Sequence, residues 1–154
     1  MLRRAFLVWF LTAAITYAAP CTVPQGLDSF AREVVDLTNE FRQKKRRAPL
    51  DVASQLSEAA QAHACDMART GNFSHTGSDG SAVQVRVAAT GYDWRFVAEN
   101  IALGQQSPDA AFRSWRGSRG HRRNMLDKRA RHIGIGVALR DGRLYWVMVL
   151  AGSQ

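Results

Sequence analysis

The sequence predicts an α+β fold in which several helices pack on a small antiparallel sheet. Apolar residues recur at helical spacing in four segments between Phe30 and Trp115. The pattern then changes to two strand-like runs, 133–139 and 144–150. Asp141-Gly142 between these runs is a strong signal for a two-residue hairpin, and so short a turn joins antiparallel strands.

The first two predicted helices each have one apolar face. In the first, over about residues 29–45, this face contains Phe30, Val34, Leu37 and Phe41. In the second, it contains Leu56, Ala59, Ala60, His63 and Met67. Gly71 stands where a glycine commonly ends an α-helix.

Two shorter helices and a third strand are predicted in the middle of the chain. Ser81 is expected to cap a helix that contains Val83 and Val87 and stops at Gly91. Ser107-Pro108-Asp109 has the order of an N-cap, a first-turn proline and an acid near the positive end of a helix. Its buried side would contain Ala111, Phe112 and Trp115. A short strand is expected over residues 99–103.

The N-terminus has the pattern of a signal peptide over residues 1–19. Arg3 and Arg4 precede an apolar run over residues 5–15, and small residues follow it. The run is short for a membrane span, which needs about 20 residues, although an uncleaved anchor stays an alternative. We therefore expect an exported protein, periplasmic or extracellular, with an N-terminal extension over residues 20–26 and one domain over residues 27–154.

Two cysteines, Cys21 and Cys65, remain after the predicted cleavage. In an oxidising compartment an even number suggests one disulfide. The alternative is that Cys65 is a small buried apolar residue. Pro20 before Cys21, and Ala18 three positions before it, match a lipid-attachment sequence poorly, so we do not expect lipidation.

The chain is basic, with a formal net charge of +8. Arginine and lysine concentrate at residues 44–47 and 113–131. These are either solvated faces or a surface attracted to anionic envelope components. No nucleic-acid-binding module accompanies them, and the predicted export also argues against DNA or RNA as a partner.

Three short polar segments are the candidates for a functional site: residues 72–75, 99–102 and 120–124. Each places an imidazole or a carboxylate, namely His75, Glu99 or His121, beside a predicted helix or strand. Two histidines and one acid suit either metal binding or acid/base chemistry. The sequence contains no Gly-x-Ser-x-Gly, His-Glu-x-x-His or paired Cys-x-x-Cys motif, which gives serine hydrolases, zinc metalloproteases and structural zinc modules no support.

The order of these segments resembles the CAP superfamily, which includes cysteine-rich secretory proteins and small bacterial relatives. The resemblance is most specific from Trp115 to Asn124, where Trp115, Ser118, Gly120-His121-Arg122 and Asn124 match the family's pattern. It covers about residues 27–152. It implies an α-β-α sandwich with a central cleft, in which the positions of His75, Glu99 and His121 converge.

The resemblance also implies roles for these residues. His75 and His121 would be imidazole ligands of a weakly bound divalent metal such as Zn²⁺, and Glu99 would orient a histidine or a water. Many members have a second acid where this chain has Ser118, so a complete four-residue site is not expected.

Three functions follow. The first is a non-enzymatic protein whose cleft binds a metal and a ligand of the lipid, sterol or peptide class. The second is a metal-assisted hydrolase with Glu99 as base and His75 and His121 holding the water. The third is a surface protein that acts through its basic residues.

Overall fold

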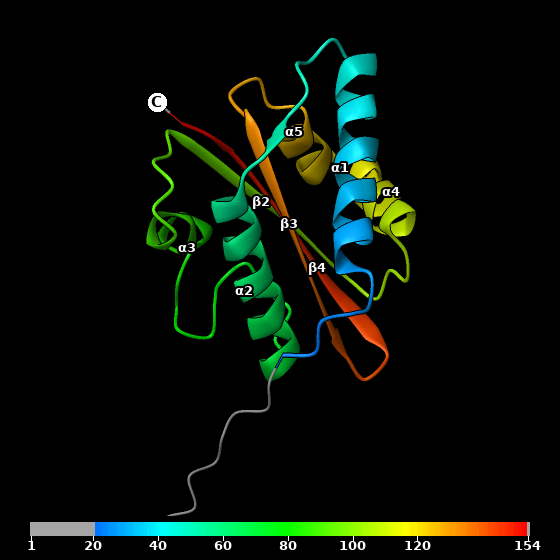
Figure 1. Cartoon of the computed structure of the whole chain (residues 1–154), viewed down its shortest axis with the longest axis vertical. Coiled ribbons are helices and arrows are strands. Elements are labelled where there is room, and N and C mark those ends of the chain that lie inside the picture. The colour runs from blue at the N-terminus through cyan, green and yellow to red at the C-terminus, as the bar shows by residue number, and fades with distance from the viewer. Residues whose placement is uncertain (1–20, 154) are drawn as a thin grey trace, which may run out of the picture.

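A four-stranded sheet lies between two layers of helices in the computed structural model, which describes residues 21–153 (Figure 1). The strands are β1 (Asp51–Val52), β2 (Phe96–Leu103), β3 (His132–Arg140) and β4 (Arg143–Gly152), in the order β1-β3-β4-β2. One face carries α1 (Leu27–Lys44), α4 (Pro108–Gly117) and α5 (Arg119–Met125), and the other carries α2 (Ser54–Thr70) and α3 (Val83–Ala89). The predicted α+β class and three-layer sandwich are confirmed. The predicted signal peptide lies outside the described residues.

The β3–β4 hairpin and two predicted helix ends are as expected. β3 and β4 pair antiparallel, with Arg140 opposite Arg143 across Asp141-Gly142. Ser107 accepts a hydrogen bond from the Ala110 N–H, and Pro108 begins α4. Gly71 ends α2 with φ at 74°, in the left-handed region that glycine adopts without strain.

Four details of the prediction are wrong. The sheet is not wholly antiparallel, because the two-residue strand β1 pairs parallel with β3. β2 begins at Phe96, so Glu99 lies within the strand and not at its entry. α5 was not predicted, and it contains His121. α3 has Ala82 at its N-cap and no side-chain cap bond, so Ser81 does not cap it.

The core on the α1 side of the sheet is aromatic. Phe41 meets Phe112 edge to face with ring centroids 6.1 Å apart, and Phe30 stacks on Trp146 at 5.8 Å. Trp115 is fully buried and donates its indole N–H to the Ile101 carbonyl at 3.0 Å. This bond joins α4 to β2 and leaves the only polar atom of the Trp115 side chain satisfied.

On the other face, α2 packs directly on the backbone of β3. A Cβ added to Gly134 would lie 2.2 Å from the backbone of Leu56 and Ser57. One added to Gly136 would lie 2.3 Å from the backbone of Ala60 and Gln61. Any larger residue at either glycine would therefore push the helix off the sheet.

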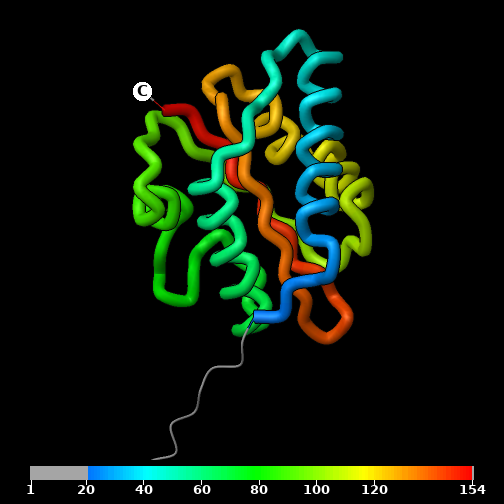
Figure 2. Tube along the Cα trace, viewed as in Figure 1, coloured from blue at the N-terminus to red at the C-terminus, as the bar shows by residue number. Residues whose placement is uncertain are grey.

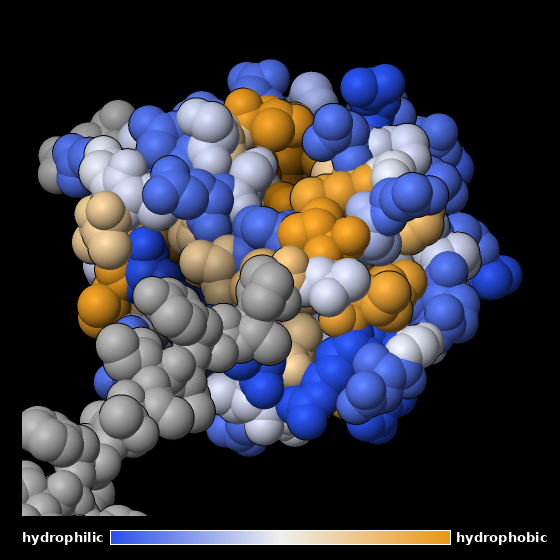
Figure 3. All heavy atoms as spheres, turned by 60° about the horizontal axis from the view of Figure 1, so that its bottom comes forward, coloured by the Kyte–Doolittle hydropathy of each residue, from blue (hydrophilic) through white to orange (hydrophobic). Residues whose placement is uncertain are grey.

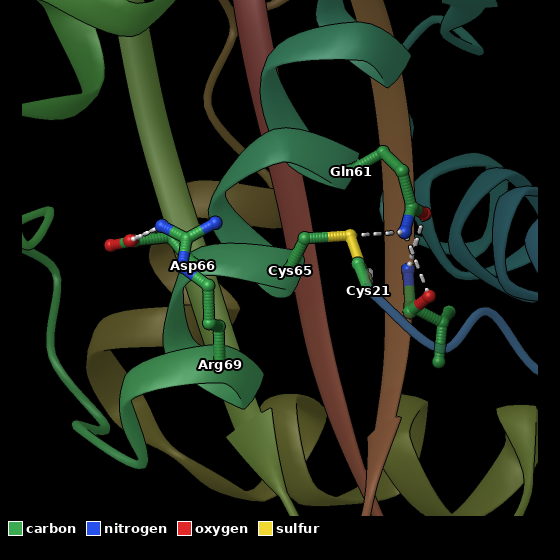
Figure 4. Close-up of a disulfide and its surroundings, with 6 residues drawn as sticks. Cys21, Gln61, Cys65, Asp66 and Arg69 are labelled. Carbon is green, nitrogen blue, oxygen red and sulfur yellow. Dashed lines mark hydrogen bonds and ion pairs between the residues drawn. A yellow bond between two sulfur atoms is a disulfide. The ribbon is translucent and has the colours of Figure 1, made fainter. Parts of the chain in front are cut away.

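The N-terminal segment is fixed to α2 by the Cys21–Cys65 disulfide, with the two Cα atoms 5.3 Å apart. The tube in Figure 2 starts beside the last turn of α2 and continues to α1. Thr22, next to Cys21, forms an isolated bridge with Leu139 of β3. Figure 4 shows Gln61 beside the disulfide, with its amide directed at β3. The disulfide interpretation of the two cysteines is thus correct.

We predict that Trp115→Ala lowers the free energy of unfolding by about 3–5 kcal/mol, since a large aromatic core residue is lost together with its hydrogen bond. Urea denaturation measures this change. Val85, which is 60% exposed on α3, is the control, and Val85→Ala should change the free energy by less than about 0.5 kcal/mol. Equal midpoints for wild type and Trp115→Ala would contradict the assignment of this side chain to the core.

Candidate functional site

The centre of the candidate site is a buried carboxylate, that of Glu99 in β2. Its side chain is only 2% exposed, and both of its oxygens are engaged. Oε2 accepts a hydrogen bond from Arg86 of α3 at 2.7 Å, and Oε1 accepts one from His75 Nδ1 at 2.8 Å. An unpaired buried carboxylate would be very unfavourable, so these two partners allow Glu99 to occupy the interior as an anion.

His75 lies at the surface above this carboxylate. Its side chain is 57% exposed, in the loop that follows α2. Because a carboxylate only accepts hydrogen bonds, the Nδ1 of His75 carries the proton in the bond to Glu99. In the neutral imidazole this leaves the lone pair on Nε2, the atom remote from Glu99. The arrangement fixes both the orientation and the tautomer of His75.

The loop that contains His75 is fixed by hydrogen bonds to side chains of α2 and α3. Arg86 donates to the carbonyl of His75 at 3.1 Å as well as to Glu99. Asp66 of α2 accepts hydrogen bonds from the backbone and hydroxyl of Ser78, three residues beyond His75. Arg86 and Asp66 therefore position the imidazole through its backbone.

His121 is brought to the same region by a pair of asparagines. The Asn124 amide donates to the side-chain oxygen of Asn100 at 2.9 Å and to the Glu99 carbonyl at 3.3 Å. Asn100, which is fully buried, donates to the His121 carbonyl at 3.1 Å. These bonds fasten α5 to β2 next to Glu99. Burial lowers the pKa of His121, and repulsion between the protonated forms of His121 and nearby His75 acts in the same direction.

α5 is also fixed from the opposite side, by the buried guanidinium of Arg42 on α1. Arg42 is 1% exposed and donates to the carbonyls of Ala48, Met125 and Asp127 at 2.7 to 3.1 Å. Burial lowers its pKa, with Arg131 and Arg47 acting in the same direction. The guanidinium thus determines where α5 ends and where the chain turns toward β3.

Ser118 lies at the junction of α4 and α5 and is half-buried. Its carbonyl accepts the first backbone hydrogen bond of α5, from the Arg122 N–H at 2.9 Å. Among residues 21–153, the Ser118 hydroxyl forms no hydrogen bond with His75, His121 or Glu99. The residue therefore shapes the turn before His121 and adds no ligand to the cluster.

A third histidine, His63 on α2, lies beneath the cluster. It is 1% exposed, and its Nε2 lies 2.9 Å from the Ser74 carbonyl and 3.8 Å from Glu99 Oε1. Within the described chain its Nδ1 has no hydrogen-bond partner. Burial lowers the pKa of His63, even though the nearby Glu99 carboxylate favours the charged form. His63 and Arg86 also line a pocket of about 450 Å³ between α2 and α3.

His75 and His121 are the side chains of this cluster that could bind a metal. His75 is oriented by a carboxylate, as metal-binding histidines commonly are, and the lowered pKa of His121 leaves its lone pair free. In the part of the chain that the structure describes, no group of three His, Cys, Asp or Glu side chains is placed to hold an ion. A bound Zn²⁺ would therefore keep water in its remaining positions and would exchange readily.

Sequence reasoning missed Arg86 and His63. Arg86 could have been found from its spacing, since it lies three residues after Val83 on a predicted helix and a buried Glu99 requires a cation. His63 belongs to the predicted apolar face of the second helix and is fully buried, but no role at the site was expected for it. Its apolar neighbours on α2 indicate that His63 is buried, but they do not show that the Glu99 carboxylate of β2 lies beside it.

Comparison with known proteins identifies the family to which this fold and this cluster belong. The model of the CAP, or cysteine-rich secretory protein, family matches residues 35–150. The chain belongs to this family. It is 33% identical to the Bacillus subtilis protein YkwD over 115 residues, which are 75% of this chain and 45% of YkwD. It is 32% identical to the Bacillus subtilis membrane protein YlbC, over 69% of this chain and 31% of YlbC. The chain thus spans less than half the length of either relative.

Solved structures show the same fold. An extracellular Bacillus anthracis protein that contains an SCP domain superposes with a TM-score of 0.78 at 25% identity, over 84% of this chain and 42% of that one. An outer surface protein of Borrelia burgdorferi superposes with a TM-score of 0.74 at 17% identity, over 80% and 92% of the two chains. No helix within residues 21–153 has the length and hydropathy needed to cross a membrane.

The lowered pKa values of His63 and His121 predict that acid destabilises the fold. In the unfolded chain these histidines take up protons as the pH falls below about 6.5, whereas in the folded protein they resist protonation. The free energy of unfolding should therefore decrease as the pH falls from 7.5 to 5.5. Urea denaturation at each pH measures it. For His63→Gln, which keeps a donor for the Ser74 carbonyl, the free energy of unfolding should decrease less steeply as the pH falls. A slope equal to that of wild type would refute the role of His63.

Proposed function

We propose that this protein is an exported, non-enzymatic CAP module that binds an exchangeable divalent metal through His75 and His121, with an anionic ligand beside them. The observation that carries the proposal is the buried Glu99 carboxylate, which holds His75 at 2.8 Å with the second imidazole nearby. The predicted signal peptide and the extracellular SCP-domain protein of similar fold support export.

The same contacts favour binding over hydrolysis. A general base must have a lone pair within reach of the water that it activates. Glu99 is buried, and its two oxygens already accept from His75 and Arg86. Its carboxylate is therefore placed to orient His75, and we do not propose that it deprotonates a water.

We predict that the purified protein binds about one Zn²⁺ per chain and that His75→Ala/His121→Ala weakens this binding at least about tenfold. Isothermal titration calorimetry measures the affinity. His132, a histidine outside the cluster on β3, provides the matched control, and His132→Gln should bind as wild type does. Equal affinities for wild type and the double variant would exclude this metal site.

Binding to an anionic envelope surface is the second candidate function, and the exposed arginines of α5 favour it. Arg119, Arg122 and Arg123 line a shallow pocket of about 440 Å³ with Gly120 and Leu126, on the helix that contains His121. A phosphate or carboxylate group held there would lie on the same helix as the proposed metal ligand. The basic residues and the imidazoles would then form one continuous binding face.

We expect the protein to sediment with phosphatidylglycerol vesicles at 50 mM NaCl and to be released at 500 mM, since charges at an exposed surface are screened by salt. Arg119→Gln/Arg122→Gln/Arg123→Gln should bind more weakly, whereas Lys44→Gln/Lys45→Gln, which removes exposed charge from the end of α1, should bind nearly as wild type does. Binding that does not depend on salt would rule out this candidate.

A further inference from the structure

Strand β3 is at the edge of the sheet for most of its length, and the protein covers this edge in pieces. β1 pairs with it at His132 and Ile133, and Thr22 pairs with Leu139. Between these two positions, the side-chain amide of Gln61 in α2 forms hydrogen bonds with β3 in the place of a neighbouring strand. Its Oε1 accepts from the Val137 N–H at 2.9 Å, and its Nε2 donates to the Val137 carbonyl at 2.9 Å.

One residue on this edge, Ile135, has no neighbouring strand or side chain of residues 21–153 paired with its backbone on the side away from β4, although only 5% of the residue is exposed, at the floor of a groove. In an antiparallel pair, successive residues direct their N–H and C=O alternately toward and away from the partner strand. The outward bonds at Ile133, Val137 and Leu139 show that Ile135 also directs its groups away from β4. Within residues 21–153, neither its N–H nor its C=O has a partner on that side. Unpaired edge groups of this kind are a template for another strand.

Ile135 lies in a groove of about 630 Å³ between α1 and α2. Figure 1 shows these two helices on either side of β3. The apolar lining comes from Leu27, Ala31 and Val35 of α1, with Val52 of β1. Val52 is 62% exposed. In Figure 3, in which the bottom of Figure 1 is turned forward, hydrophobic residues gather near the middle of the surface and are bordered by hydrophilic ones.

The charge of the groove is opposite to that of the protein. Asp28, Asp36 and Glu58 line it, against one cation, Arg32. The whole chain, in contrast, has a formal net charge of +8. A ligand with lysine or arginine at its ends would complement this rim, whereas a fatty-acid carboxylate would be repelled by it.

We propose that this groove binds an extended peptide segment with an apolar side chain between basic residues. One peptide residue pairs with the Ile135 N–H and C=O as an added strand, its apolar side chain packs against Val52 and Ala31, and its cations face Asp36 and Glu58. Because Gln61 and β1 already cover the adjacent positions, the pairing is limited to one residue and the binding is weak. The site lies outside the His75–Glu99 cluster and does not depend on the function proposed above.

The test uses a synthetic peptide, Lys-Val-Thr-Val-Thr-Lys with blocked ends, and nuclear magnetic resonance of the ¹⁵N-labelled protein. We expect the Ile135 amide signal to shift and its hydrogen exchange to slow as the peptide is added. An analogue with both valine nitrogens methylated has lost those donors, and one with glutamate in place of lysine has the wrong charge. Neither analogue should produce these changes.

Matched variants separate the groove from the rest of the surface. Asp36→Lys/Glu58→Lys should weaken peptide binding about tenfold, because two attractive charge pairs become repulsive. Glu33→Lys, an exposed position on α1 that does not line the groove, should bind normally. Ala31→Trp, which fills the groove, should abolish binding, and His75→Ala/His121→Ala should leave it unchanged.

Several results would overturn the proposal. One is equal binding of the methylated peptide, and another is an Ile135 amide that does not respond to any peptide. Protection of that amide without peptide, if it is lost on dilution, would mean that a second copy of the chain occupies the groove.

Discussion

The contact on which the rest of the structure depends is that between α2 and β3. Gly134 and Gly136 have no side chains, so the backbone of the helix rests on the backbone of the strand. At this separation, Gln61 reaches the edge of β3, Cys65 meets Cys21, and His63 lies under β2. One helix thereby serves the core, the disulfide and the candidate site.

Compensation of a buried charge explains the arrangement of the candidate site. Glu99 lies in β2, at one edge of the sheet, and its carboxylate is stabilised there by groups from two separate segments, Arg86 of α3 and the loop of His75. These groups are fixed in turn by further hydrogen bonds, notably from Arg86 to the His75 carbonyl. The exposed imidazole is thus oriented by interactions that lie almost entirely below the surface.

Much of the fold could be predicted from the sequence because its signals are local. The helix start at Ser107-Pro108, the glycine that ends α2 and the Asp141-Gly142 hairpin each depend on a few adjacent residues. The elements that were missed have weak local signals. β1 contains two residues and forms only because β3 is beside it, and α5 has seven residues, several of them arginine and glycine.

The candidate site was accessible to sequence reasoning only in part. The polar segments around His75, Glu99 and His121 could be recognised, and the contact between Glu99 and His75 agrees with that selection. The identity of the second partner, Arg86, depends on the packing of α3 against β2, and the role of Asn124 depends on where α5 ends. Both are long-range consequences of the fold.

Arg42 has a consequence for how this protein can vary. In the sequence it looks like one more member of a basic surface, yet its planar guanidinium donates to four backbone carbonyl groups from inside the core. A lysine has a single nitrogen and could not satisfy all of them. Substitution on α1, in the layer next to the sheet that contains Glu99, would therefore loosen the segment that presents His121, so attempts to redesign the charge of this domain should leave that arginine in place.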